Sequence, residues 1–209
     1  MTEWLADKLV ILPAILIGLT FHEFAHGKVA ALLGDPTPGE QGRLTLNPLP
    51  HIDWIGFFML MFFSFGWAKP VMVSPWKFNR KIAMKTGMLL VSLAGPAMNF
   101  LLAFFSAVIL RLISEFYGGS YGNIVLILLN MLWYNIILAL FNLIPLPPLD
   151  GSKVLAGLLP DKGSRLIYSL EKYGPLLLMI LIISNVFARY VLPVAHMIQD
   201  FILTAVMAL

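Results

Sequence analysis

The chain alternates between long apolar runs and short polar segments. A helix needs about 20 predominantly apolar residues to cross the hydrocarbon core of a bilayer. We therefore expect an all-α polytopic membrane protein with five to six transmembrane helices. Five runs approach or exceed the required length: Leu9–Leu33, Met88–Leu110, Ile124–Leu143, Pro175–Leu192 and Val194–Leu209, the last being the shortest.

A further apolar run is too short to cross as a helix. Residues 55–65 read IGFFMLMFFSF, and a helix of this length reaches about 16 Å, roughly half of a bilayer core. Glycines flank the run at Gly56 and Gly66. We expect a re-entrant or β-hairpin-like element here, after the first helix.

The amino-acid composition excludes several classes of protein. Of the 209 residues, 59% are hydrophobic and 12% are charged, whereas soluble domains carry about 25% charged residues. These values exclude a soluble globular protein and a disordered chain. The absence of cysteine excludes a disulfide framework and cysteine metal ligands. A net charge of +3 is too small to indicate a nucleic-acid partner, so the expected partner is the lipid bilayer.

The first apolar run carries the strongest chemical signal, the HExxH pattern of residues 22–26. On a helix, His22 and His26 share a face and can bind one metal ion. Glu23 is close enough to act as a general base toward water at the same ion. Two imidazoles and a carboxylate are costly within a membrane span unless they have a function. We therefore expect a metal site in this helix.

A catalytic zinc usually has three protein ligands, so a third must come from elsewhere. Asp150 is the best candidate because it ends the proline-rich run of residues 142–151, NLIPLPPLDG, where the prolines stop the preceding helix. Backbone groups freed at such a break need protein or water partners, as in membrane-embedded functional sites. The alternative is that Asp150 caps a helix over Gly151–Leu158.

Four segments, in this order, resemble the site-2 proteases, which are intramembrane zinc metalloproteases. They are HEFAH, FGWAKPV (Phe65–Val71), SLAGPAMN (Ser92–Asn99) and NLIPLPPLDG (Asn142–Gly151). The resemblance implies an endopeptidase that cleaves transmembrane substrates, with one Zn²⁺ per chain. It implies His22, His26 and Asp150 as ligands, Glu23 as the catalytic residue, and Asn99 and Asn142 as substrate-binding residues. For Asn142, a hydrogen bond at the helix break is an equal alternative.

The resemblance covers about 130 of the 209 residues. It implies one membrane domain over residues 1–209, with its core at 9–159 and C-terminal helices at 173–209. PDZ or CBS domains, which relatives often carry, are not expected, and a bacterial or archaeal cell membrane is the expected location. Trp54 departs from the family pattern, where a proline is expected. Gly87 and Gly95 are expected to permit close helix approach.

The shared metal site and the loop charges predict the topology. Residues 67–85 hold four lysines, one arginine and no acid, and residues 144–172 are also rich in lysine and arginine. Both loops should therefore be cytoplasmic. His26 and Asp150 approach the same membrane face only if residues 55–65 dip into the membrane and return. We therefore expect an external N-terminus and an active site toward the cytoplasm.

Two other functions fit parts of the sequence. A metal-binding transporter would have ionisable residues distributed across its spans, whereas here they cluster at one point. A catalytically inactive scaffold that binds membrane helices would not need Glu23. The intramembrane protease is therefore the leading hypothesis.

Overall fold

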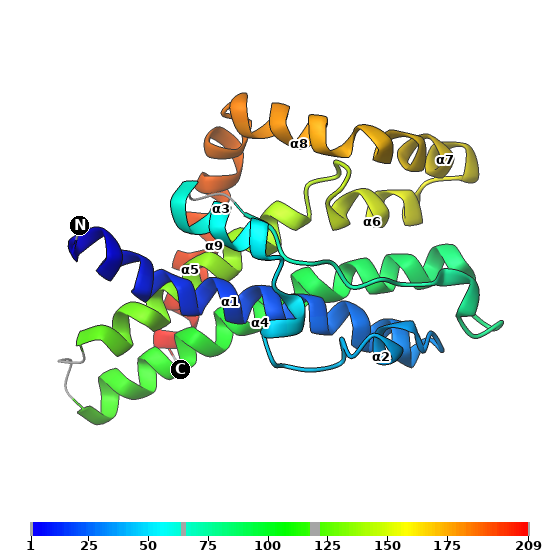
Figure 1. Ribbon diagram of the computed structural model, residues 1–209. Coiled ribbons are helices and arrows are strands. Elements are labelled where there is room, and N and C mark those ends of the chain that lie inside the picture. The colour runs from blue at the N-terminus through cyan, green and yellow to red at the C-terminus, as the bar shows by residue number, and fades with distance from the viewer. Residues whose placement is uncertain (1, 64–65, 118–121, 209) are drawn as a thin grey trace.

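The computed structural model describes residues 2–63, 66–117 and 122–208, and most of these residues are helical. Three long helices pack side by side: α1 (Thr2–Leu32), α4 (Met84–Tyr117) and α5 (Gly122–Asn142) (Figure 1). Within the described ranges, strand pairing is limited to one isolated bridge between Ile52 and Ala68. The prediction of an all-α fold is confirmed.

Shorter helices surround these three. They are α2 (Thr37–Glu40), α3 (Trp54–Phe63), α6 (Asp150–Leu158), α7 (Asp161–Leu170), α8 (Gly174–Ile183) and α9 (Leu192–Met207). Single turns of 3₁₀-helix occur at Leu49–His51, Pro75–Lys77 and Glu171–Tyr173, and a π-helical turn occurs at Phe187–Val191. In Figure 1, α7 and α8 follow one another along one side of the molecule, and α9 then runs steeply across α5 and α4.

Five helical stretches of the described chain are long and apolar enough to cross a membrane, as the sequence predicts. They are Lys8–Leu32, Met84–Phe116, Gly122–Asn142, Asp161–Ile183 and Phe187–Met207. The chain is therefore an integral multi-pass membrane protein. Leu209, the expected end of the last span, lies outside the described residues.

The expected boundary between the last two spans is wrong. Instead of one helix over Pro175–Leu192, the helical stretch ends at Ile183, and the chain turns before the next stretch begins at Phe187. Asn185 sits in this turn with φ of 57°, a left-handed conformation that asparagine adopts more readily than most residues. The Ser-Asn pair therefore breaks a stretch whose hydrophobicity alone reads as continuous.

Small side chains let the core helices approach closely. Ala103 and Ala107 of α4 pack with Leu132 and Ile136 of α5, and α9 contributes Ala195 to the same buried cluster. In a membrane, association depends on close packing between helices because lipid is as apolar as the side chains. This packing provides a rigid frame for the polar residues of α1.

The short apolar run forms a helix, and the chain after this helix returns to the residues that precede it. α3 has 10 residues, about 15 Å of helix. Ile52 bridges Ala68, and Lys69 N donates to the His51 carbonyl at 2.9 Å. The two ends of the segment therefore lie together, as expected of a re-entrant element and not of a crossing. The β-hairpin alternative is wrong for residues 54–63, while residues 64–65 lie outside the described chain.

Candidate metal centre

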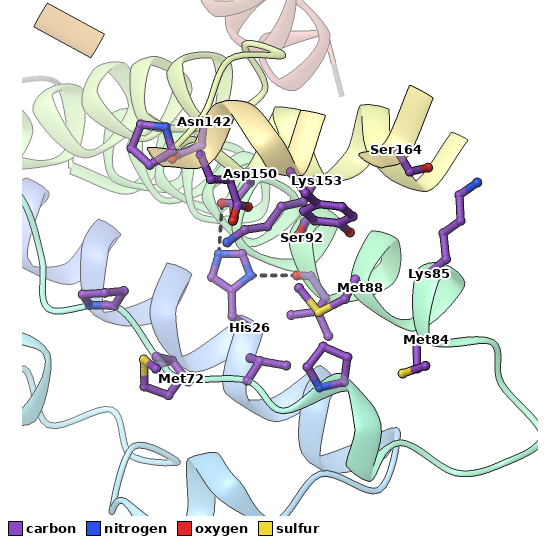
Figure 2. A pocket seen from close by; sticks show the side chains of 18 of the residues that line it. His26, Met72, Met84, Lys85, Met88, Ser92, Asn142, Asp150, Lys153 and Ser164 are labelled. Carbon is purple, nitrogen blue, oxygen red and sulfur yellow. Dashed lines mark hydrogen bonds and ion pairs between the residues drawn. The ribbon is translucent and has the colours of Figure 1, made fainter. Parts of the chain in front are cut away.

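Three side chains from two distant segments converge at one point. His22 and His26 lie one turn apart on α1, and Asp150 is the first residue of α6. The two Nε2 atoms are 2.9 Å apart, and Asp150 Oδ2 lies 3.1 Å from His22 Nε2 and 3.0 Å from His26 Nε2. Figure 2 shows Asp150 and His26 directed toward each other and joined by a dashed line. The structure thus brings together the three expected ligands.

Hydrogen bonds behind the imidazoles determine which ring nitrogens carry protons. His26 Nδ1 lies 2.7 Å from the Val91 carbonyl, which can only accept, so Nδ1 is the donor. His22 Nδ1 lies 2.6 Å from Asn99 Oδ1 and is likewise the donor. Each neutral ring therefore presents an Nε2 lone pair toward the same point. Metal-bound histidines are oriented by carbonyl partners in this way.

This donor set fits a divalent metal ion. Two imidazole lone pairs and a carboxylate oxygen lie about 3 Å apart, and such groups repel one another unless a cation or proton lies between them. Two histidines with one carboxylate, and an open fourth position, are a known ligand set of catalytic zinc. Zinc is therefore the ion that the residues suit best.

Asp150 is directed to this point by the turn that precedes it. Leu149 is the extended residue before α6, and Asp150 makes no side-chain hydrogen bond that caps the helix. The alternative that Asp150 caps the helix is therefore wrong. Gly151 permits the tight turn, since a Cβ there would lie 2.3 Å from the Leu143 carbonyl oxygen. Burial raises the pKa of Asp150, and the facing imidazoles lower it by more when they are protonated.

Glu23 lies beside this cluster and is held by Val71, the last residue of the FGWAKPV segment. Its Oε2 accepts a hydrogen bond from Val71 N at 2.8 Å. Arg43, which is only 4% exposed, donates through Nη2 to the carbonyls of Lys69 and Pro70, immediately before Val71. Burial lowers the pKa of Arg43 and the Glu23 carboxylate partly offsets this. The sequence feature that could have identified Arg43 is its position as an arginine within a glycine- and proline-rich loop.

Asn99 and Asn142 occupy different positions relative to the cavity. Asn99 is fully buried behind His22, and its Nδ2 donates to the Gly18 carbonyl at 3.1 Å and to Asn135 Oδ1 at 2.8 Å. All of its polar atoms are engaged, so we propose that it positions His22 instead of contacting substrate. Asn142 lines the cavity, and its Nδ2 donates to the Leu138 carbonyl at 3.0 Å, one turn earlier in α5, so the substrate-binding role and the helix-break alternative both stay predictions.

Replacing Asn99 should weaken metal binding. In Asn99→Ala, His22 loses the acceptor that fixes its tautomer and ring orientation, so we expect zinc affinity to fall about 10- to 100-fold. Competition with a chromogenic chelator would measure the change. Asn130→Ala is the matched control because the Asn130 amide donates within α5 to the Leu126 carbonyl. Equal zinc affinity in Asn99→Ala and Asn130→Ala would contradict the positioning role.

The cluster opens into a polar cavity of about 840 Å³. One side is formed by residues 70–73 and the N-terminal half of α4, and the other by α6 and α7. A second cavity, of about 500 Å³ and mostly apolar, lies farther along the same helices. It is lined by residues 15–20 of α1 and 134–141 of α5, directly before His22 and Asn142 in each helix. The two cavities therefore follow one another along α1 and α5.

Comparison with known proteins identifies the family of this chain. The model of peptidase family M50 matches residues 119–184, which include Asp150. The chain is also 34% identical to "Putative zinc metalloprotease YwhC" of Bacillus subtilis (strain 168), over 97% of this chain and 95% of that protein. The chain belongs to peptidase family M50, the site-2 protease family. This confirms the resemblance drawn from the four sequence segments.

Two further relatives of this M50 peptidase are more distant. It is 26% identical to "Putative zinc metalloprotease Rip2" of Mycolicibacterium smegmatis (strain ATCC 700084 / mc(2)155), over 92% of this chain and 74% of that protein. It is also 26% identical to the Rip2 protein of Mycobacterium tuberculosis (strain ATCC 25618 / H37Rv), over 91% of this chain and 73% of that protein. No solved structure matches the chain.

Proposed function

We propose that this M50 peptidase is an intramembrane zinc endopeptidase of the HExxH type. One Zn²⁺ per chain is held by His22, His26 and Asp150, and Glu23 is the catalytic residue. The observation that carries the proposal is the convergence of two imidazole lone pairs and a carboxylate beside Glu23 in one cavity. The relatives' names, which describe zinc metalloproteases, support the choice of metal.

The chain's own residues account for the proton transfers of peptide hydrolysis. Zinc, when bound, supplies Lewis acidity that activates water and polarises the substrate carbonyl. Glu23 accepts a proton from the attacking water and delivers it to the nitrogen of the departing amine. The hydrogen bond from Val71 N to Oε2 orients the carboxylate, and Arg43 holds the backbone from which Val71 projects. Asn142, which lines the cavity, is proposed to contact the substrate.

The proposed substrates are membrane-spanning proteins. A peptide bond is cut only after its helix unwinds, because helical carbonyls are occupied by internal hydrogen bonds. The apolar cavity beside Leu16 and Leu19 suits a substrate's membrane-embedded part, and the polar cavity next to it holds the proposed catalytic residues. The succession of these two cavities supports cleavage near the end of a transmembrane segment.

We further propose that the active site faces the cytoplasm and that the N-terminus is external. The start of α1 lies at the opposite end of the molecule from α2 and α7 (Figure 1), and the loops near α7 are the basic ones. The chain has no cysteine, so Glu3→Cys introduces a single thiol. An impermeant thiol reagent should label it from outside. Labelling from the cytoplasmic side alone would contradict the topology.

Removing the metal tests the proposed function directly. The purified protein should contain one zinc per chain and cleave a model transmembrane peptide. Chelation should abolish cleavage, and added zinc should restore it, because no other group on the chain supplies the Lewis acid. Cleavage by fully chelated protein would refute the zinc mechanism. Zinc accumulation in protein-containing vesicles, without peptide cleavage, would favour a transporter.

A further inference from the structure

The polar cavity carries more charge than the proposed chemistry uses. Besides the two histidines, seven Asp, Glu, Lys or Arg side chains line it. Two of them, Glu23 and Asp150, belong to the proposed catalytic site. The other five are Lys85, Lys153, Asp161, Arg165 and Glu171.

Two of these five charges are paired with each other, and two more are exposed to water. Lys85 Nζ lies 3.8 Å from Asp161 Oδ1 and also donates to the Leu159 carbonyl. Arg165 and Glu171 are both solvent-exposed. Water screens such exposed groups and lowers the cost of leaving them unpaired. Lys153 is therefore the remaining cation of the cavity wall.

Lys153 differs from the other lining cations in its position and surroundings. It follows Asp150 by three residues on α6, which places both side chains on one face of the helix. It is partly buried, and its side-chain ammonium forms no hydrogen bond or ion pair with residues 2–63, 66–117 or 122–208. Figure 2 shows its side chain extending toward the side of the cavity where His26 and Asp150 face each other.

We propose that Lys153 binds a side-chain carboxylate of the substrate near the cleaved bond. This inference rests on the proposed function and narrows the substrate class to membrane segments with Asp or Glu on their aqueous flank. A partly buried ammonium without a partner is costly, and an incoming carboxylate would remove that cost. The apolar cavity holds no comparable cation, so the charged flank and the membrane-embedded part of the substrate would occupy chemically different sites.

The test uses model transmembrane peptides with amidated C-termini. In successive peptides, one position of the aqueous flank carries Asp, Asn or Lys. Wild type should cleave an Asp peptide at one register with kcat/KM about 10-fold above its Asn counterpart, as expected for a partly desolvated ion pair. Lys153→Met should abolish the preference, Lys153→Arg should keep it, and Lys153→Glu should favour the Lys peptide. Arg165→Met removes a lining cation from α7 and should leave the preference unchanged.

Binding measurements separate this inference from the proposed function. In the Glu23→Gln background, Kd should show the same Asp-over-Asn preference and the same dependence on Lys153, whether or not cleavage occurs. An equal Kd for the two peptides at every register, or a preference that persists in Lys153→Met, would overturn the inference. If only peptides with a free C-terminal carboxylate bind more tightly, and this gain in affinity depends on Lys153, then the ligand is not a side-chain carboxylate. Cleavage that does not depend on Glu23 would instead refute the proposed function.

Discussion

A Gly95→Ala protein should fold but fail to hold zinc. Gly95 lies on α4 against the imidazoles, and a Cβ there would be 2.5 Å from His22 Cε1 and 2.5 Å from His26 Nε2. The rings cannot retreat without breaking their bonds to Asn99 and Val91. Because supporting contacts alone change metal affinity 10- to 100-fold, direct displacement of two ligands should cost about 100-fold or more. Zinc content after dialysis and cleavage of a transmembrane peptide would measure the loss.

Gly87→Ala provides a control on the same helix. A Cβ at Gly87 would lie 2.5 Å from Phe78 Cδ2, an equally tight approach at a place away from the histidines. In both variants, alanine is about 1 kcal/mol more favourable than glycine within a helix, which partly offsets crowding. Gly87→Ala should therefore bind zinc normally even where its thermal stability falls. Full zinc occupancy in Gly95→Ala would show that the imidazoles are not held where the structure places them.

Hydrophobicity averaged over long stretches of sequence predicts the membrane-spanning helices. It does not predict where the chain turns between them. Runs such as Ile124–Leu143 predict helices because a helix of this length pairs its polar backbone groups internally, as a segment in lipid must. The turn at Asn185 depends on one residue's left-handed conformation, which hydropathy does not record. The fold of residues 52–69 depends on pairing between Ile52 and Ala68, two positions that the local sequence does not connect.

The candidate site shows the same division between local and distant information. The spacing of His22 and His26 predicts a shared face because helical periodicity is local. The bond between His22 and Asn99 joins residues 77 positions apart, so the positioning role of Asn99 was not predictable from the segment around either residue. The role of Arg43 in holding residues 69–71 was likewise not predicted. Its acceptors are the main-chain carbonyls of Lys69 and Pro70, and every residue has such a carbonyl.

Replacing Glu23 by glutamine should separate proton transfer from metal binding. Glu23→Gln keeps the size of the side chain and an oxygen that can accept the Val71 N–H, which now bonds Oε2 at 2.8 Å. It removes the group that accepts and returns a proton, a contribution of about 100- to 10,000-fold in such reactions. We therefore expect kcat to fall by a factor within this range while the zinc content stays at one per chain, because the proposed ligands His22, His26 and Asp150 are intact.

The proposed role of Glu23 depends on both halves of that result. Glu40→Gln is a suitable control because Glu40 is an exposed acid whose carboxylate pairs with Lys77 at 3.6 Å, on α2 and outside the cavity. It should cleave at the wild-type rate. If Glu23→Gln cleaves a transmembrane peptide as fast as Glu40→Gln, then Glu23 is not the base. If it loses zinc together with activity, the damaged metal centre explains the lost cleavage, and the result contradicts the separation of proton transfer from metal binding.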